Sequence, residues 1–253
     1  MYLKLQKPSC AINAKLTVLL LFIVCCCGCS DRNQVGKAIT DTKKGDFTGF
    51  ATSINGEGDI IALGAPFFDT DSLGAGQVKL FKNIDEKWTP LGEPINGIAL
   101  GGHFGSAIAM NSEGTIIAIS APQDNSKGER AGKVQVFRYA KERWQQLGQD
   151  FFGNKAYDEF GKALSISDDG TILAIGNPPN PKFESDYGSI SVYRLTENEQ
   201  WRPMGSAIVG NFMITEDLSF ISPDDDVVEI PLLGNALKLS GDGQTLLAGT
   251  SKQ

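Results

Sequence analysis

A repeat of about 56 residues is the feature that most limits how this chain can fold. Three consecutive copies place the same residues at that spacing: Gly49, Gly105 and Gly161; Gly58, Gly114 and Gly170; Pro66, Pro122 and Pro178; Gly76, Gly132 and Gly188. Trp88 and Trp144 keep the same spacing, and Trp201 comes one position later than the spacing would place it. The chain is therefore built from several copies of one structural unit.

Each copy contains the pattern of four short strands. In the first copy a strand of small residues (50–54) leads through a Gly-rich turn to an apolar strand (60–65). A polar loop follows, then an alternating strand around Val78 and Leu80, then a strand that holds Trp88. No apolar stripe has helical spacing, so the pattern predicts an all-β chain. Four antiparallel strands in about 56 residues are typical of one blade of a β-propeller-type repeat.

Two short motifs extend this interpretation to a family. Phe-Gly stands at 104–105 and 160–161, and Gly-Ala-Pro or Ser-Ala-Pro stands at 64–66 and 120–122. Over residues 36–249 the chain resembles the FG-GAP-type repeats of bacterial surface lipoproteins, which are related to the integrin-α propeller. The resemblance implies recognition or adhesion at a cell surface and names no ligand.

The N-terminal segment, residues 1–28, has the composition of an export signal. Lys4, Lys7 and Lys15 precede an apolar run over 16–27, which is too short to span a membrane. Gly28-Cys29 then resembles the lipobox of bacterial lipoproteins. We expect cleavage after Gly28, lipid attachment (palmitate) at Cys29, and a position in the bacterial cell envelope, on the periplasmic or cell-surface side. An uncleaved signal anchor is the alternative.

The repeat also sets the expected domain boundaries. Residues 29–44 form a tether and the end of a blade strand, because 35–39 align with 91–95. The copies then cover 45–100, 101–156 and 157–211, an insert covers 212–231, and a partial fourth copy covers 232–253. The insert is either a long solvated loop or a binding loop. The blades form either an imperfectly closed ring or part of a larger propeller.

Composition removes several classes of site. The formal net charge of −7 disfavours a nucleic-acid partner, and a single histidine, His103, excludes multi-His metal sites. Weak metal candidates are Asp69, Asp71, Asp168 and Asp169, but the loop spacing does not support calcium, so no cofactor is expected. His103 occupies a position that varies between copies, which is typical of a surface turn.

The preferred hypothesis is a membrane-anchored, extracytoplasmic binding or adhesion module that is not an enzyme. Its variable loops 67–75, 123–131 and 179–187 would bind a protein or glycan ligand. One alternative is a glycan-active enzyme with acidic residues, such as Asp158 and Glu159, on one propeller face. Another is a truncated fragment of a larger propeller protein. The three tryptophans are expected to pack between blades rather than to stack on sugars.

Overall fold

The chain folds into antiparallel sheets and contains no helix within the residues that the structure describes. This computed structural model describes residues 35–40, 45–179, 188–210 and 232–251. The expected signal peptide (1–28), Cys29 and the insert (212–231) lie outside these residues. The all-β prediction is confirmed. Nothing in the described part of the chain is a helix long and apolar enough to cross a membrane.

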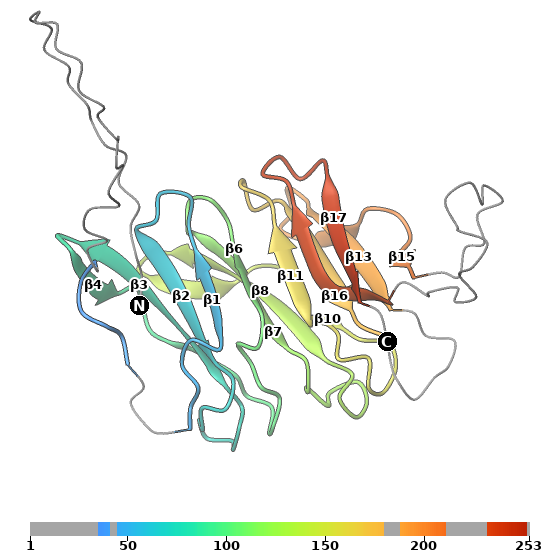
Figure 1. The fold of residues 1–253 in the computed structure, drawn as a ribbon, viewed down its shortest axis with the longest axis horizontal. Coiled ribbons are helices and arrows are strands. Elements are labelled where there is room, and N and C mark those ends of the chain that lie inside the picture. The colour runs from blue at the N-terminus through green and yellow to red at the C-terminus, as the bar shows by residue number, and fades with distance from the viewer. Residues whose placement is uncertain (1–34, 41–44, 180–187, 211–231, 252–253) are drawn as a thin grey trace, which may run out of the picture.

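The strands group into four blades that follow one another along the chain (Figure 1). Blade 1 contains β1 (Ala51–Ile54), β2 (Ile60–Ala65), β3 (Gln77–Ile84), β4 (Lys87–Pro90) and β5 (Ile95–Asn96). Blade 2 contains β6 (Ile108–Met110), β7 (Ile116–Ala121), β8 (Lys133–Ala140), β9 (Arg143–Gln146) and β10 (Phe151–Phe152). Blade 3 contains β11 (Ala163–Ile166), β12 (Ile172–Asn177), β13 (Ser189–Leu195), β14 (Trp201–Pro203) and β15 (Ile208–Val209). Blade 4, as described, contains β16 (Leu232–Leu239) and β17 (Leu246–Ser251).

Within blades 1 to 3 every pairing is antiparallel and the order is the same. The first strand pairs with the second, the second with the third, and the third with two short outer strands. The four-stranded antiparallel blades predicted from the sequence are confirmed, and the outermost strand of each is split into two short pieces. In blade 1 the outer strand stops at Pro90 and resumes at Ile95, because Gly92 between them has a φ of +76° that a strand cannot accommodate.

The first strands of consecutive blades lie next to each other, β1 beside β6, β6 beside β11 and β11 beside β16. The turns that follow these strands are joined by backbone hydrogen bonds. The N–H of Gly56 donates to the carbonyl of Ser112 (2.8 Å), that of Ser112 to Asp168 (3.1 Å), and that of Asp168 to Gly241 (2.8 Å). We call this end of the blades the turn end.

The opposite end of the blades carries two kinds of loop, which pair with each other. One kind joins the second and third strands of a blade, and the other leads from one blade into the next. The N–H of His103 donates to the carbonyl of Gly74 (3.1 Å), and that of Glu159 donates to Arg130 (3.0 Å) at the equivalent place. We call this end of the blades the loop end.

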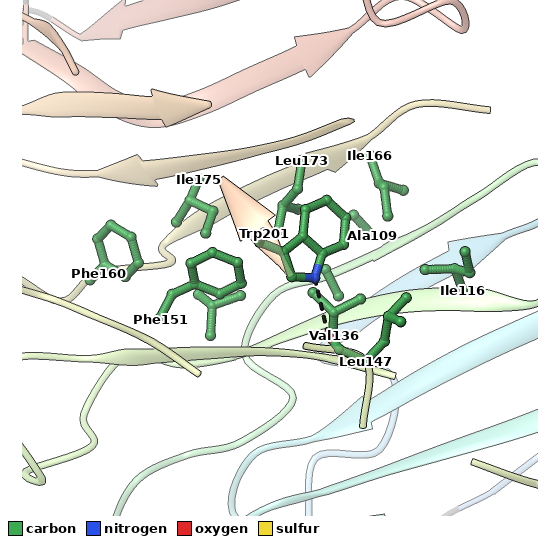
Figure 2. Packing of buried hydrophobic residues seen from close by; sticks show 12 residues of the cluster. Ala109, Ile116, Val136, Leu147, Phe151, Phe160, Ile166, Leu173, Ile175 and Trp201 are labelled. Atoms are coloured by element: carbon green, nitrogen blue, oxygen red, sulfur yellow. Dashed lines mark hydrogen bonds between the residues drawn. The ribbon is translucent and has the colours of Figure 1, made fainter. Parts of the chain in front are cut away.

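The core lies between the blades rather than inside one sheet. The largest cluster joins Val136 and Leu147 of blade 2 to Leu173 and Trp201 of blade 3 (Figure 2). Trp201 is only 1% exposed and donates from Nε1 to the carbonyl of Leu147 (3.0 Å). A single four-stranded sheet cannot cover both of its faces, so neighbouring blades supply the apolar contact.

All three tryptophans make the same contact with the preceding copy, as expected for packing between blades. Trp144 Nε1 donates to the carbonyl of Leu91 (2.9 Å), and Trp88 Nε1 donates to that of Val35 (3.0 Å). Val35 thus occupies the place that Leu91 has one copy later, which agrees with the expected alignment of 35–39. Residues 35–40 nevertheless form no strand.

The glycine of each Phe-Gly pair lies where two blades approach most closely. A Cβ on Gly161 would lie 2.4 Å from Val134 Cγ2 and 2.9 Å from Ser120 Cβ, both in blade 2. Its φ is +92°, a backbone conformation that favours glycine. Blade packing therefore requires glycine at Gly161, and the positive φ, which Gly49 and Gly105 share, favours glycine at this position in all three copies.

Candidate functional site at the loop end

One repeat position at the loop end combines an unusual backbone with a side chain that changes from copy to copy. It is filled by Phe47, His103 and Glu159, which have φ values of +55°, +57° and +46°. A bulky residue with a positive φ is uncommon and costs about 1–3 kcal/mol. The scaffold keeps this backbone in all three copies while the side chain is apolar, then basic, then acidic. Such strain is frequent at functional sites.

His103 is the first component of the candidate site. Its backbone is held on both sides, because its N–H donates to Gly74 and its carbonyl accepts from Ser106 Oγ (2.7 Å). Its imidazole lies 4.5 Å from the ring of Phe67, centroid to centroid, and forms no hydrogen bond with the described residues. Burial lowers the pKa of His103, and the positive charge of Arg130 lowers it further. Both effects favour the neutral form of the imidazole at pH 7.

A charged cluster in blades 2 and 3 is the second component. The Arg130 guanidinium forms an ion pair with Glu159, and the second oxygen of Glu159 lies 3.6 Å from Lys162 Nζ. Nε of Arg130 is buried and has no hydrogen-bond partner within the described residues. Two cations thus share one carboxylate, so these three side chains together carry one positive charge. A net positive group of this kind attracts an anion or stabilises developing negative charge.

The adjacent acids Asp158 and Glu159 have different roles, so they do not form a glycosidase pair. Asp158 is buried, and its Oδ2 accepts hydrogen bonds from the backbone N–H groups of Asn154 and Lys155, each 2.8 Å long. It stabilises its own turn. Glu159 alone reaches the charged cluster. Two free carboxylates that face each other, as glycoside hydrolysis requires, are therefore not supplied by this pair.

The four weak metal candidates lie at opposite ends of the blades. Asp69 and Asp71 are in the loop after β2, and Asp69 Oδ1 accepts from the N–H of Gly74 (3.0 Å). Asp168 and Asp169 are at the turn end. Both oxygens of Asp169 are already used by Ser167 and Thr171 within its own turn. No group of three or more His, Cys, Asp or Glu side chains fit for a metal occurs among the described residues.

Sequence reasoning interpreted His103 as a surface turn and did not connect it with Arg130 or Lys162. His103 is half-buried, and the side chain that varies at this position accompanies a positive φ in all three copies. A usable signal was present in the repeat itself. Two strongly basic residues near this position, Arg130 and Lys162, occur where the first copy has Gly74 and Phe50.

Comparison with known proteins finds similarity in structure alone. No protein-family model and no curated protein matches the chain. Among solved structures, a "putative 6-phosphogluconolactonase" from Bacteroides uniformis aligns with 16% identity and a TM-score of 0.48, over 78% of this chain and 46% of that one. A second protein so described, from Bacteroides fragilis, aligns with 17% identity and a TM-score of 0.46, with the same two coverages. A protein of unknown function from Desulfotomaculum acetoxidans aligns with 10% identity and a TM-score of 0.46, over 84% and 59%.

The chain thus spans about half the length of the first structures that it matches. At these identities the likeness concerns the fold alone. The two Bacteroides proteins are nevertheless described as enzymes, which goes against our expectation of a binding or adhesion module that is not an enzyme. We withdraw that expectation. The descriptions of these two proteins agree better with the alternative of a glycan-active enzyme, although the acidic pair Asp158 and Glu159 named for it does not form such a site.

Proposed function

We propose that this protein is a hydrolase that cleaves a carbohydrate-derived ester or lactone at the loop end. The observation that carries the proposal is the imidazole of His103, which has no hydrogen-bond partner among the described residues, lies 4.5 Å from the Phe67 ring, and shares the loop end with the ion-paired cluster of Arg130, Glu159 and Lys162. A neutral histidine beside a positive group is suited to activate water against a carbonyl carbon.

The reaction needs only the substrate and water. His103 takes a proton from water as the water oxygen bonds to the carbonyl carbon, and the carbonyl oxygen becomes negative. Arg130 and Lys162 stabilise that charge, since both are cations that share a single carboxylate. The bond from the carbonyl carbon to the alcohol oxygen then breaks. The protonated imidazole returns its proton to that oxygen, which yields a carboxylic acid and an alcohol.

The name of the two Bacteroides proteins suggests 6-phosphogluconolactone as a first substrate to test. Its phosphate offers the negative charge that Arg130 and Lys162 would bind. Gluconolactone without phosphate is the matched comparison, and 4-nitrophenyl acetate tests ester cleavage without a sugar. The proposal depends on His103 and the charged cluster rather than on these names, so hydrolysis of any one of the three substrates would support it.

The test is hydrolysis by the purified full chain and by His103→Asn. Asparagine tolerates a positive φ, so this variant removes the base and keeps the turn. We expect it to lose about 100-fold or more of the rate above the uncatalysed reaction. Glu113→Gln, at the turn end, is the control and should keep full activity. An unchanged rate in His103→Asn, or no turnover of any of the three substrates, contradicts the proposal.

The pH profile tests the same role. Catalysis requires the neutral imidazole, and the pKa of His103 lies below its ordinary value of 6.5. The rate should therefore rise as the pH increases through a value below 6.5 and stay level above it. A rate that is still rising between about pH 7 and pH 8 would assign the base to another group.

We also propose, from the residues of the leader and the repeat motifs, that the mature protein is an FG-GAP-type lipoprotein of the cell envelope, lipidated at Cys29. Support comes from Lys4, Lys7, Lys15, the apolar run 16–27 and Gly28. The intact mass of the membrane-extracted protein tests this. It should fit residues 29–253 plus acyl chains, and a mass that includes residues 1–28 and no lipid would contradict it.

A further inference from the structure

The loop end of blade 1 is apolar at positions where blade 2 is polar. Six large apolar side chains there are between 41% and 79% exposed: Phe47, Phe50, Phe67, Leu73, Ile98 and Leu100. We call these six residues the apolar patch. One copy later the same positions hold His103, Ser106, Gln123, Glu129, Asn154 and Ala156. The repeat therefore does not require large apolar residues here, since blade 2 folds without them.

The patch is one connected surface built around Phe67. The ring of Phe67 lies 5.1 Å from that of Phe47 and 6.4 Å from that of Phe50, centroid to centroid. The loops that carry the other three residues are joined by hydrogen bonds. The N–H of Gly101 donates to the carbonyl of Leu73 (2.9 Å), and Thr70 Oγ1 donates to that of Gly97 (3.3 Å). Exposed apolar groups of this extent usually mark a binding surface.

The patch is continuous with the charged cluster through His103. Phe67 packs against His103 at 4.5 Å, and the loop that carries Arg130 is joined to the His103 loop by the N–H of Gln123, which donates to the carbonyl of Gly102 (3.3 Å). Across three adjacent blades the same two repeat positions change from Phe47 and Phe50, to His103 and Ser106, to Glu159 and Lys162 (Figure 1). The loop end is therefore apolar at blade 1, carries the base at blade 2, and is ionic at blade 3.

The distribution of charge fixes the orientation of a ligand. The described loops of blade 1 (45–49, 66–76 and 97–103) contain Asp46, Asp69 and Asp71 and no lysine or arginine. The Lys79 ammonium of β3 lies 5.6 Å from the ring of Phe68, so blade 1 offers one nearby cation, whereas Arg130 and Lys162 offer two to an anionic group. An apolar group gains from covering the exposed phenyl rings. A molecule with an apolar group at one end and an anionic group at the other is therefore favoured in one orientation, with its central part at His103.

We infer that the loop end binds an amphiphilic substrate, whose acyl or aromatic part covers the apolar patch and whose anionic or strongly polar part faces Arg130 and Lys162. The cleavage of its ester bond rests on the hydrolase function proposed above, whereas binding does not. The apolar patch is thus the subsite that selects the acyl or aryl group of the substrate.

Two measurements test this inference. The first is kcat/KM for 4-nitrophenyl acetate and 4-nitrophenyl butyrate. We expect a preference of about 15-fold for butyrate, because it buries two more CH₂ groups and each is worth about fourfold. The double variant Phe50→Ser and Phe67→Gln carries the residues that blade 2 has at these positions. It should reduce the ratio of butyrate to acetate to about one. Leu247→Gln changes another exposed apolar residue and should keep the ratio.

The second measurement is binding of octyl phosphate by titration calorimetry, with inorganic phosphate and octyl glucoside as comparisons. Octyl phosphate should bind at least fivefold more tightly than either, and the double variant should remove this advantage. If no ester is cleaved but octyl phosphate binds in this way, the hydrolase function fails and the inference stands. If the variant changes neither the ratio nor binding, the inference is wrong. It is also wrong if the double variant converts a dimer to a monomer in sedimentation, because the patch is then a contact between copies.

Discussion

Blade 1 and blade 3 carry the same isoleucine in the same strand position, and only one of the two is buried. Ile166 in β11 is 6% exposed because blade 2 covers it, and the equivalent Met110 in β6 is 9% exposed because blade 1 covers it. Ile54 in β1 is 53% exposed. Gly49 shows the same difference, since nothing lies within 4 Å of its Cβ position, whereas Gly161 is tightly packed. Burial in this fold is thus a property of blade neighbours.

Blade 4 differs from the inner blades in its composition as well as its exposure. Thr245, directly before strand β17, occupies the position that is isoleucine in the three earlier copies (Ile60, Ile116 and Ile172). Leu247 within β17 is 71% exposed, whereas the equivalent Ala174 of blade 3 is fully buried. The face of blade 4 that points away from blade 3 therefore combines one polar replacement, Thr245, with one large exposed apolar side chain, Leu247. Both end blades of the described array thus expose apolar side chains that a neighbouring blade covers in the inner blades.

The largest expected effect comes from comparing the variants Ile166→Ala and Ile54→Ala. The first should lower the free energy of unfolding by about 2–5 kcal/mol, because it opens a cavity between blades 2 and 3. The second should cost less than about 1 kcal/mol, since the side chain is already half exposed. Urea denaturation of both variants measures the difference. Equal losses would mean that blade 1 is covered in solution as fully as blade 3.

A second test compares Gly161→Ala with Gly49→Ala. The two glycines have nearly the same φ, +92° and +90°, so the backbone strain of an added Cβ is shared. Only at Gly161 does the Cβ also meet Val134 and Ser120. We expect Gly161→Ala to lose about 1–3 kcal/mol more than Gly49→Ala. Thermal unfolding of both variants gives this difference, and a result with the opposite sign would disprove the proposed blade contact.

The smallest expected effect concerns Asp169 at the turn end. Its burial disfavours the charged form, but hydrogen bonds from Ser167 and Thr171 outweigh this and lower its pKa below 3.8. The ionised side chain therefore stabilises the fold above pH 3.8, and this contribution is lost as the pH falls through the lowered pKa. Asp169→Asn should cost well under about 1 kcal/mol at neutral pH, since the side chain is exposed.

The measurement for Asp169 is the melting temperature of wild type and variant from roughly pH 2 to pH 6. The difference between them should shrink as the pH falls below 3.8. Asp168→Asn is the matched control, because the Asp168 carboxylate accepts no hydrogen bond from the described residues. A difference that stays constant with pH would show that the charge of Asp169 does not contribute to stability.

Much of the scaffold could be predicted because packing repeats with the sequence. The apolar runs of the first two copies coincide with the observed strands β2 (Ile60–Ala65) and β7 (Ile116–Ala121). A short apolar run between two turns is typical of a strand that is buried on both faces. The split of the outer strand could not be predicted. It depends on the positive φ of Gly92. A Cβ added at Gly92 would lie only 3.2 Å from Cδ1 of Trp144 in the next blade, so the contact between the blades also favours glycine there.

The candidate site was the part that sequence reasoning missed. His103 and Arg130 are far apart along the chain and belong to different loops, and nothing in their local patterns connects them. Pairing of the two loop types at the loop end brings them together. Asp158 and Glu159 were predicted as a pair because they are adjacent. Their side chains separate, one into a turn and one into the charged cluster.

The sequence by itself determined the all-β class, the length of the repeat, the position of its strands and the glycines that every blade contact needs. These follow from local rules, since strand periodicity, turn residues and blade packing recur in every copy of the repeat. Only the tertiary structure decided which equivalent residues are buried, which loops meet, and that an apolar patch, a neutral histidine and a charged cluster lie side by side. Those features depend on which blade is the neighbour, and a repeat pattern that is the same in every copy carries no such information.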